Sequence, residues 1–417
     1  MFCKGFDNDK LMKKKTVCVI GLGYIGLPTA ALIANKGFVV SGIDINEDIV
    51  LKINKGEIHI IEDGLKAYVK SAILSGKLKA FNKIQQSDVY IICVPTPFQN
   101  KSREIPKPNI DYVLSATKSI SQFIKPGDLI ILESTSPVGT TEKVKQTLKN
   151  CGASLEDVHI AYCPERVLPG KIMAEIVEND RIVGGLSSIS TKKVMEFYRL
   201  FVSGNIVETD AKTAEMCKLA ENSFRDLNIA FANELSMICD NHDINVWNLI
   251  KLANKHPRVN ILQPGTGVGG HCIAVDPWFI VSQNKEKAKL IQTAREINNY
   301  KTKWVIDKIK NYVDSYQKNG IKPKIACLGL AFKPNIDDLR ESKALEVVET
   351  LITDGYEVIA VEPNIQSLKN LKILNLNDAI EQVDLICLLV KHREFLEPEV
   401  KKKLMKSQVL DFCGALT

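Results

Sequence analysis

Short runs of mainly hydrophobic residues recur along the first half of the chain, each followed by glycine or polar residues. A run of this length without regular polar alternation is typical of a strand buried on both faces, as in a parallel sheet. Between the first two runs, the helical pattern of residues 27–36 ends at Gly37. The pattern predicts strands alternating with helices in a doubly wound parallel sheet. The predicted strands are 17–20, 38–44, 88–94, 129–133 and 159–162.

The middle of the chain contains no proline or glycine from Ala211 to about His242. Hydrophobic residues recur there at steps of three and four, which predicts one helix with a packed apolar stripe. A helix of about thirty residues is roughly 45 Å long. We expect it to link two domains and to form the surface of a homodimer. The predicted stripe is Cys217, Ala220, Phe224, Leu227, Phe231, Leu235 and Ile238.

The last third of the chain repeats the strand and helix order of the first. After a lysine-rich helix over 294–318, the pattern predicts a helix at 343–354 and strands at 322–330, 356–361, 384–390 and 408–412. We therefore expect an α/β protein with two Rossmann-like doubly wound parallel-sheet domains joined by a central helical domain. The expected boundaries are 1–15 for a flexible leader, then 16–208, 209–302 and 303–417 for the three domains.

Composition and charge agree with a soluble enzyme of several domains. A chain of 417 residues favours two or three domains, and 45% hydrophobic with 25% charged residues is ordinary. The net charge of +6 comes from 55 basic and 49 acidic residues spread along the chain, so no block indicates nucleic acid. The eleven irregularly spaced cysteines and the lack of a signal peptide pattern predict reduced thiols in the cytoplasm. Residues 16–35 lack charge, but glycines and Pro28 favour a strand-to-helix turn over a membrane span.

A glycine-rich turn, Gly21-Leu22-Gly23-Tyr24-Ile25-Gly26, joins the first predicted strand to the first helix. GxGxxG alone is a weak signal, but strand, turn, helix and a second strand ending in Asp44 form a dinucleotide fingerprint. Gly21 allows the turn, Gly23 lets the backbone approach a pyrophosphate, and Gly26 packs the helix against the strand. Asp44 follows Gly26 by 18 residues and is placed to bind a ribose diol, which favours NAD over NADP. We therefore predict an NAD site that includes Tyr24 and Ile25; the alternative is a glycine turn without a ligand.

Further candidate side chains follow the carboxyl ends of predicted strands, where open α/β sheets bind ligands. Thr96 and Thr135 are candidate hydroxyls for the cofactor or the active site, or else local capping groups. Glu165 is a candidate acid or base, although with Arg166 beside it a surface ion pair is the alternative.

One side of the long helix carries Lys218, Asn222 and Arg225 at successive turns. An ammonium, an amide and a guanidinium grouped in this way suit an oxyanion and a phosphate. A solvated helix face is the alternative.

A loop over 264–277 contains four glycines in seven positions and one thiol, Cys272, followed four residues later by Asp276. Glycine tolerates positive φ and close approach, and an open, polar setting is what a nucleophilic cysteine needs. The spacing alone does not distinguish a nucleophile from a buried structural cysteine. Outside this loop, cationic side chains are available for an anionic ligand at His256, Arg258, Lys333 and Arg340. Because the C-terminal unit lacks GxGxxG, we expect it to hold a nucleotide by charge.

Together these motifs resemble the nucleotide-sugar 6-dehydrogenases, the family that includes UDP-glucose dehydrogenase. The resemblance runs from Val17 to about Gly414 in the family's order: GLGYIGLP, VPTP, ESTSPVGTT, CPERVLPG, the Lys218/Asn222 helix, GVGGHC with Asp276, and AFKP with DLRES. It implies a four-electron oxidation of a sugar C6 alcohol to a carboxylate in polysaccharide biosynthesis. It also implies two NAD molecules per turnover, no metal, a UDP-sugar as partner and no membrane.

The resemblance also implies a role for each candidate residue. Lys218 would remove the C6 hydroxyl proton, directly or through water, and Cys272 would form a thiohemiacetal and then a thioester. Lys218 and Asn222 would stabilise oxyanions, with Asp276 orienting or assisting Lys218, while Thr135 and Glu165 would position water. The residues implied for the UDP-sugar are Arg166, Val167, Arg225, His256, Arg258, Gly267 and Lys333, with Arg340 near the cofactor.

Within this family, residues 56–60, 256–262 and 270–277 resemble the members that oxidise UDP-N-acetyl-D-mannosamine. The glucose enzymes have a tyrosine, a lysine and a second glutamate where this chain has His271, Val275 and Pro169. UDP-glucose and UDP-N-acetylglucosamine remain alternative substrates. A regulatory or scaffold protein that binds nucleotides without catalysis is the alternative of another class, and the presence of Cys272 and Lys218 argues against it.

Overall fold

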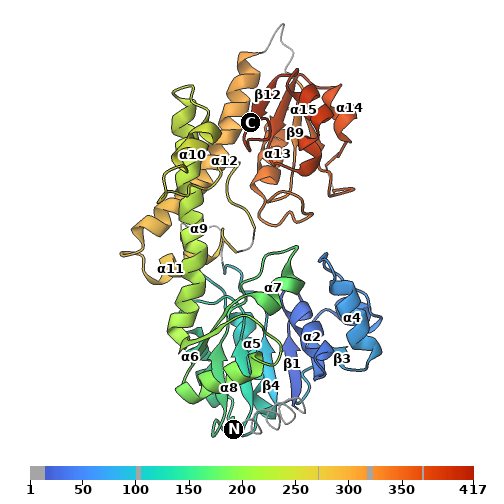
Figure 1. Ribbon diagram of the computed structural model, residues 1–417, viewed down its shortest axis with the longest axis vertical. Helices are drawn as coiled ribbons and strands as arrows, with labels where there is room; N and C mark the ends of the chain where they lie inside the picture. The colour runs from blue at the N-terminus through green and yellow to red at the C-terminus, as the bar shows by residue number, and fades with distance from the viewer. Residues whose placement is uncertain (1–14, 100–104, 271, 317–322, 369–370) are drawn as a thin grey trace. The chain divides into compact units, whose positions relative to one another are not determined.

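The computed structural model describes residues 15–99, 105–270, 272–316, 323–368 and 371–417. The chain forms two compact units, Met1–Ala220 and Glu221–Thr417, whose helices and strands are labelled in Figure 1. Nearly all of the predicted leader, 1–15, lies outside the described residues.

The first unit is built on an eight-stranded sheet in the order β3-β2-β1-β4-β5-β6-β7-β8. Neighbouring strands are parallel except β6 and β7, which are antiparallel, a reversal that the hydrophobic pattern did not predict. The strands are β1 (Thr16–Ile20), β2 (Val39–Ile43), β3 (Leu78–Phe81), β4 (Val89–Ile92), β5 (Leu129–Leu132), β6 (His159–Tyr162), β7 (Arg181–Gly185) and β8 (Ile206–Asp210).

Helices cover both faces of this sheet, which explains why the central strands are hydrophobic without alternation. Alternate residues of β1, β4 and β5 enter two separate cores, one shared with α2, α4 and α8 and the other with α5 and α6. The helices are α2 (Gly26–Asn35), α3 (Glu47–Asn54), α4 (Leu65–Leu74), α5 (Asp111–Ile120), η1 (Ser121–Phe123), α6 (Thr140–Asn150), α7 (Ile172–Glu178) and α8 (Ser188–Tyr198).

Helix α2 is uncharged because residues 26–34 are all buried. This accounts for the uncharged stretch noted in the sequence. Among the helices of the described residues, none is both long and apolar enough to cross a bilayer.

The second unit contains a parallel four-stranded sheet in the order β10-β9-β11-β12. Its strands are β9 (Ile325–Leu328), β10 (Val358–Val361), β11 (Leu385–Leu388) and β12 (Val409–Asp411). One core joins this sheet to α12 and α13, and the other joins it to α14 and α15. The remaining helices are α9 (Ala211–Asp240), α10 (Val246–Ala253), α11 (Asp276–Gln283), α12 (Lys289–Ser315), α13 (Lys343–Thr353), α14 (Leu376–Ile380), η2 (Arg393–Leu396) and α15 (Pro398–Leu404). The predicted fold class is confirmed by the two sheets and the helical region between them in sequence.

Helix α9 begins in the first unit and continues into the second, but its predicted apolar stripe is wrong in part. Phe224, Phe231 and Ile238 are 70%, 48% and 49% exposed. Over this part of the helix, the buried face carries polar side chains instead, among them Asn233 and Ser236. Periodicity identifies an apolar face, but it does not reveal whether the same chain covers that face.

The polar face of α9 is buried against polar residues of α12. Arg295 donates to Asp226 at 2.6 Å, and Lys301 donates to the Ser236 hydroxyl at 2.7 Å. Burial lowers the pKa of Lys301 to about 7. These bonds pair groups that are costly to bury alone, so polar contacts hold the two helices together here.

Candidate active site

The glycine turn at the start of α2 is tightly packed on its inner side. Gly21 has a φ of +91°, and a Cβ there would lie 2.7 Å from the Cys93 carbonyl oxygen. A Cβ on Gly26 would lie 1.8 Å from the carbonyl oxygen of Gly21, whereas one on Gly23 would meet no atom within 4 Å. A side chain is therefore excluded at Gly21 and Gly26, which pack against backbone atoms, whereas the space beside Gly23 is open.

Asp44 lies next to this turn, directly after β2. Its carboxylate accepts the backbone N–H of Leu22 at 3.1 Å and that of Asn46 at 2.9 Å. Helix α2 has no side-chain cap at its N-terminus, and the Leu27 N–H donates to the Gly23 carbonyl oxygen at 3.1 Å. An anion at this turn would therefore meet the positive end of the helix dipole. Tyr24 and Ile25 lie half-buried within the turn. The glycine turn, the Asp44 carboxylate and the start of α2 together fit a dinucleotide.

Thr96 and Thr135 lie in the loops that follow β4 and β5. The Thr96 hydroxyl donates to the carbonyl oxygen of Thr135 at 2.7 Å. The structure therefore brings these two candidates together and ties their loops to each other at the carboxyl edge of the sheet.

Glu165 is 7% exposed and pairs with Arg181, the first residue of β7, rather than with its sequence neighbour Arg166. Its Oε2 lies 2.6 Å from the Arg181 Nη2, whereas Arg166 donates to the Asp180 carbonyl oxygen at 3.0 Å. The alternative of a surface ion pair is therefore wrong. Because β7 is antiparallel to β6, its first residue lies beyond the carboxyl end of β6, where Glu165 is found.

A second buried carboxylate, Glu133, shares this guanidinium. Its Oε1 lies 3.6 Å from Arg181 Nη1 and accepts the Tyr198 hydroxyl at 2.5 Å. Its Oε2 accepts the Cys93 thiol at 3.2 Å. We call Cys93, Glu133, Glu165, Arg181 and Tyr198 the buried cluster.

Burial dominates the acid–base properties of the buried cluster. It raises the pKa of Glu133; the Arg181 cation opposes this rise and the Glu165 carboxylate adds to it. Burial also raises the pKa of Tyr198 and of the Cys93 thiol well above their ordinary values. Tyr198 and Cys93 therefore remain protonated donors. Sequence reasoning did not identify Arg181 and Glu133 as site residues, although a charge directly after a buried strand, as at Glu133, is a usable signal.

Lys218 and Asn222 lie on successive turns of α9. The Lys218 ammonium donates to the Glu165 carbonyl oxygen at 2.8 Å. In the second unit, the Asn222 amide donates to the carboxylate of Asp276, the buried first residue of α11. The third residue of the predicted set, Arg225, is exposed.

Cys272 is half-buried at the end of the glycine loop, and its carbonyl oxygen accepts the N–H of Asp276 at 2.8 Å. Helices α9 and α12 hold the loop: Asn233 accepts the N–H of Gly265 at 2.9 Å, and Thr302 donates to the Thr266 carbonyl oxygen at 3.0 Å. His271 lies outside the described residues.

The segment that precedes α13 packs against the other side of this loop. The N–H of Gly270 donates to the Arg340 carbonyl oxygen at 3.1 Å, and a Cβ at Gly269 would lie 2.5 Å from the Glu341 carbonyl oxygen. Gly267 has a φ of +136°, a conformation that favours glycine. Because the glycines lack a Cβ, the loop fits between helices α9 and α12 on one side and the segment before α13 on the other.

The candidate cations for the substrate lie on separate elements. His256 and Arg258 are exposed after α10, and the His256 Nδ1 accepts the Arg258 N–H at 3.3 Å. Lys333 is half-buried between β9 and α13, and Arg340 forms an ion pair with Asp338. Among the other candidates, Val167 lies half-buried in the loop that contains Glu165.

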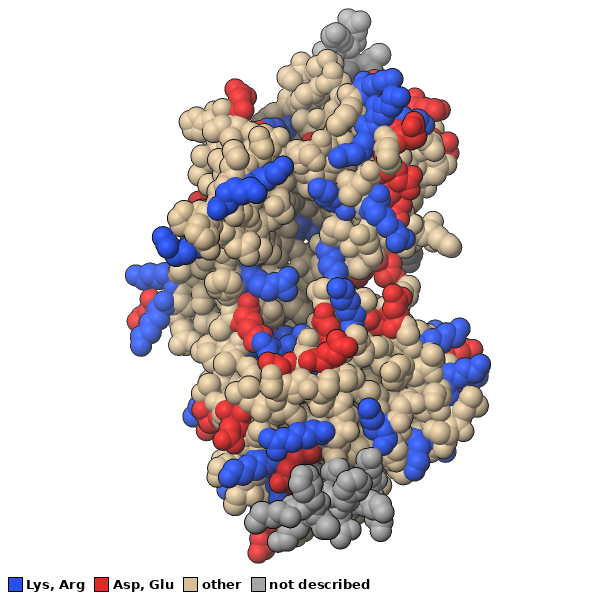
Figure 2. Space-filling view, viewed as in Figure 1, with Lys and Arg blue, Asp and Glu red and all other residues tan. Residues whose placement is uncertain are grey.

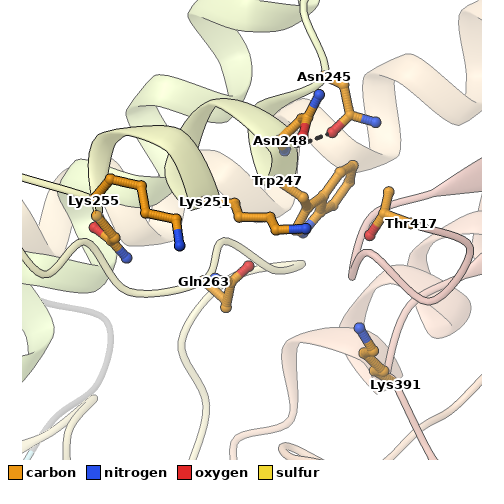
Figure 3. A pocket seen from close by; sticks show the side chains of 9 residues that line it. Asn245, Trp247, Asn248, Lys251, Lys255, Gln263, Lys391 and Thr417 are labelled. Atoms are coloured by element: carbon orange, nitrogen blue, oxygen red, sulfur yellow. Dashed lines mark hydrogen bonds between the residues drawn. The ribbon is translucent and has the colours of Figure 1, made fainter.

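A cavity of about 740 Å³ in the second unit is lined by residues that sequence reasoning did not select. Figure 3 shows Lys251 of α10, Lys255 just after α10 and Lys391 after β11 projecting toward it. None of its described lining residues is an aspartate or a glutamate, and three are lysines, so the side chains around it favour an anionic ligand. The four-residue spacing of Trp247, Lys251 and Lys255 is the signal that could have found it. The lining is Asn245, Trp247, Asn248, Lys251, Asn254, Lys255, Gln263, Lys391 and Thr417.

The surface charge follows the mixed pattern of the sequence. On the face shown in Figure 2, lysine and arginine side chains are interspersed with aspartate and glutamate on both units. Within the described part of the chain, no three histidine, cysteine, aspartate or glutamate side chains are grouped so that they could hold a metal ion.

Comparison with known proteins gives matches along nearly the whole chain. Family models of the UDP-glucose/GDP-mannose dehydrogenase family match at residues 15–202 (NAD binding domain), 212–300 (central domain) and 326–417 (UDP binding domain). A UDP-N-acetyl-D-mannosamine dehydrogenase of Campylobacter jejuni is 52% identical, over 95% of this chain and 98% of the relative. The enzyme of that name from Escherichia coli K12 is also 52% identical, over 92% of this chain and 95% of the relative. The solved structure of a UDP-D-ManNAc dehydrogenase from Pyrococcus horikoshii superimposes with a TM-score of 0.88 at 38% identity, over 96% of each chain.

Proposed function

Because the chain belongs to the UDP-glucose/GDP-mannose dehydrogenase family, we propose that it oxidises UDP-N-acetyl-D-mannosamine at C6 to UDP-N-acetyl-D-mannosaminuronate. The family predicted from the motifs is confirmed, and the chain is an NAD-dependent oxidoreductase of nucleotide sugars. The choice of sugar rests on the 52% identity to relatives of that name over 92% and 95% of the chain.

The residues at the glycine turn would hold NAD. Gly21, Gly23 and Gly26 form a turn that is open at Gly23, and the start of α2, which has no side-chain cap, directs the positive end of its helix dipole toward this turn. Asp44 would accept the hydroxyls of a ribose, with Thr96 and Thr135 at the adjoining strand ends. When bound, NAD accepts a hydride from C6 in each of two oxidations, so two molecules are consumed for each sugar.

Lys218 serves the first oxidation as the base. As C6 loses a hydride, the proton of its hydroxyl passes to the Lys218 amine, directly or through water, and an aldehyde is formed. The bond from Lys218 Nζ to the Glu165 carbonyl oxygen, at 2.8 Å, limits the positions that the amine can take.

Cys272 then retains the aldehyde. Its thiolate forms a bond to the carbonyl carbon, and the oxygen takes a proton to give a thiohemiacetal. Lys218 and the Asn222 amide stabilise the negative oxygen during this addition, and Asp276 orients that amide through its hydrogen bond. Loss of the second hydride from C6 and of the hydroxyl proton yields a thioester.

Glu165 serves hydrolysis. It takes a proton from a water positioned with Thr135, the water oxygen bonds to the thioester carbon, and the C–S bond breaks to release the Cys272 thiolate. Overall, one alcohol, one water and two NAD⁺ become one carboxylate, two NADH and three protons.

The UDP-sugar would be held by side-chain cations and by loops near the thiol. Arg225, His256, Arg258 and Lys333 would bind its UDP part, and Arg340 would lie near the cofactor. Arg166, Val167 and Gly267 would contact the sugar nucleotide in the loops of Glu165 and Cys272. The exposed Phe224, Phe231 and Ile238 of α9 would form the surface of a homodimer, since exposed apolar patches mark interfaces.

Turnover tests the substrate. Purified protein is given NAD and UDP-N-acetylmannosamine, UDP-glucose or UDP-N-acetylglucosamine, and NADH release is followed. We expect the first sugar to be used best, with two NADH for each sugar oxidised. A preference for UDP-glucose would refute the choice of sugar, and absence of NADH with all three would support a protein that binds nucleotides without catalysis.

A further inference from the structure

Two buried carboxylates share one buried guanidinium beside the candidate active site. Arg181 is 3% exposed, as is Glu133. The guanidinium lies 2.6 Å from Glu165 and 3.6 Å from Glu133, and it stacks on the Tyr198 ring at 4.8 Å. It also donates to the Ile176 carbonyl oxygen at 3.2 Å and lies 3.9 Å from the Cys163 sulfur. The Arg181 cation is therefore held between two carboxylates that lie at different distances from it.

A lone Arg181–Glu165 pair would make a poor base. If Glu165 took a proton, the guanidinium would be left buried without a counter-charge, which is strongly unfavourable. The Lys218 ammonium, bonded to the Glu165 carbonyl oxygen at 2.8 Å, would oppose protonation further. Two cations and no second anion would therefore hold Glu165 in its ionised form, with little tendency to accept a proton from water.

Glu133 supplies the missing counter-charge. Both of its oxygens accept hydrogen bonds, from Tyr198 and from Cys93, and no other described acid is placed within ion-pair distance of Arg181. Burial and the Glu165 carboxylate both raise the pKa of Glu133, against the effect of Arg181, and the two acids form a pair that shares one guanidinium. One proton added to this pair takes the two carboxylates and the guanidinium from a net charge of −1 to 0.

We propose that Glu133 is a positioning residue that acts through Arg181 and makes Glu165 a usable base for thioester hydrolysis. As Glu165 takes the proton of the attacking water, Arg181 shifts its pairing from Glu165 to Glu133. The water oxygen bonds to the thioester carbon and the C–S bond breaks, while Glu133 gains and loses no atoms. This inference rests on the role proposed above for Glu165.

The two oxidations do not use Glu165 as a base, so loss of Glu133 should affect hydrolysis selectively. In Glu133→Gln the side chain keeps its size but loses its charge, and Arg181 pairs with Glu165 alone. Arg181 then holds Glu165 more strongly in its ionised form, which makes Glu165 a weaker base. We expect a burst of two NADH per active site followed by steady-state turnover slowed about tenfold or more, with the acidic limb of the pH–rate profile moved to lower pH.

Three further variants separate this proposal from its alternatives. Tyr198→Phe removes the hydrogen bond to Glu133 and keeps all three charges, so it should retain the acidic limb and most of the turnover. Glu165→Gln should stall hydrolysis after the same burst. If Glu133→Gln fails to fold, Arg181→Lys replaces it, because a lysine is a point charge that cannot bridge two carboxylates as a guanidinium does; it too should show the burst and slow hydrolysis.

The outcomes distinguish the role of Glu133 from the role of Glu165. The role of Glu133 would be overturned if Glu133→Gln showed wild-type turnover and an unmoved acidic limb, or if Arg181→Lys showed wild-type turnover. In either case, stalled hydrolysis in Glu165→Gln would leave the proposed function standing. Wild-type turnover in Glu165→Gln would instead refute the role of Glu165, and the inference about Glu133 would fail with it. An equal shift of the acidic limb in Tyr198→Phe would assign the effect to hydrogen bonding rather than to charge.

Discussion

Asn233 joins the glycine loop of Cys272 to the two long helices, and its replacement by alanine gives a sharp test of how the loop is held. The Asn233 side chain accepts the N–H of Gly265 at 2.9 Å and donates to Asn298 at 2.9 Å. Asn233 and Asn298 are both fully buried. Asn233→Ala therefore leaves one backbone donor and one side-chain acceptor without these partners.

The expected magnitude follows from these two groups. Each buried polar group left unsatisfied costs about 1–3 kcal/mol, so after partial relaxation we expect the free energy of unfolding of the second unit to fall by roughly 2–4 kcal/mol. Because the loop loses one of its supports, we also expect kcat to fall. NAD affinity should be unchanged, since the glycine turn lies in the first unit.

Chemical denaturation followed by tryptophan fluorescence measures this loss. The three tryptophans of the chain, Trp247, Trp278 and Trp304, all belong to the second unit, so the signal reports its unfolding. Asn228→Ala is the matched control: Asn228 lies on the same helix and donates to the Phe224 carbonyl oxygen through an exposed bond, and its loss should change stability by no more than about 0.5 kcal/mol. Equal stability of the two variants would refute the reasoning.

Three other predictions address the thiol, the interface of α9 and α12, and the exposed face of α9. Cys272→Ser should abolish uronate formation with NAD affinity nearly unchanged, and wild-type NADH production would contradict the covalent route. Burial lowers the pKa of Lys301 from 10.5 to about 7. Between about pH 7 and 10.5 the unfolded chain therefore binds more protons than the folded chain, so the free energy of unfolding should rise with pH. Lys301→Met should abolish that rise in denaturation curves, and an unchanged slope would count against a buried neutral lysine. Phe231→Glu should convert the proposed homodimer to a monomer in analytical ultracentrifugation, whereas an unchanged mass would exclude this face from the interface.

Much of the fold could be predicted because its signals are local. The runs that became β1, β4, β5 and β6 are mainly hydrophobic and show no regular polar alternation, since a central parallel strand has no solvent face. A Cβ at Gly21 or Gly26 would clash with backbone atoms, so glycine is required there and the turn can be predicted from the sequence alone. The order of these elements was enough to predict the α/β architecture, and the sequence motifs predicted the family.

The edges and faces of elements were harder to predict. The antiparallel direction of β7 follows from how the chain returns to the sheet, which a run of apolar residues does not encode. On α9, Phe224 and Phe231 follow a helical apolar period and yet are exposed, whereas Asn233 is fully buried. The difference arises because α12 supplies polar partners to one face of α9, and nothing within α9 indicates which face its neighbour covers.

The sequence by itself determined which chemical groups are available: a dinucleotide turn, one thiol in a glycine loop, and a lysine and an amide on successive turns of a helix. Only the tertiary structure decided their partners. Glu165 pairs with Arg181, 16 residues away, rather than with the adjacent Arg166, and Glu133 joins them from another strand end. The physical reason is that charge pairing in a buried site depends on which strand ends meet at one edge of the sheet, and that meeting is a property of topology rather than of neighbouring residues.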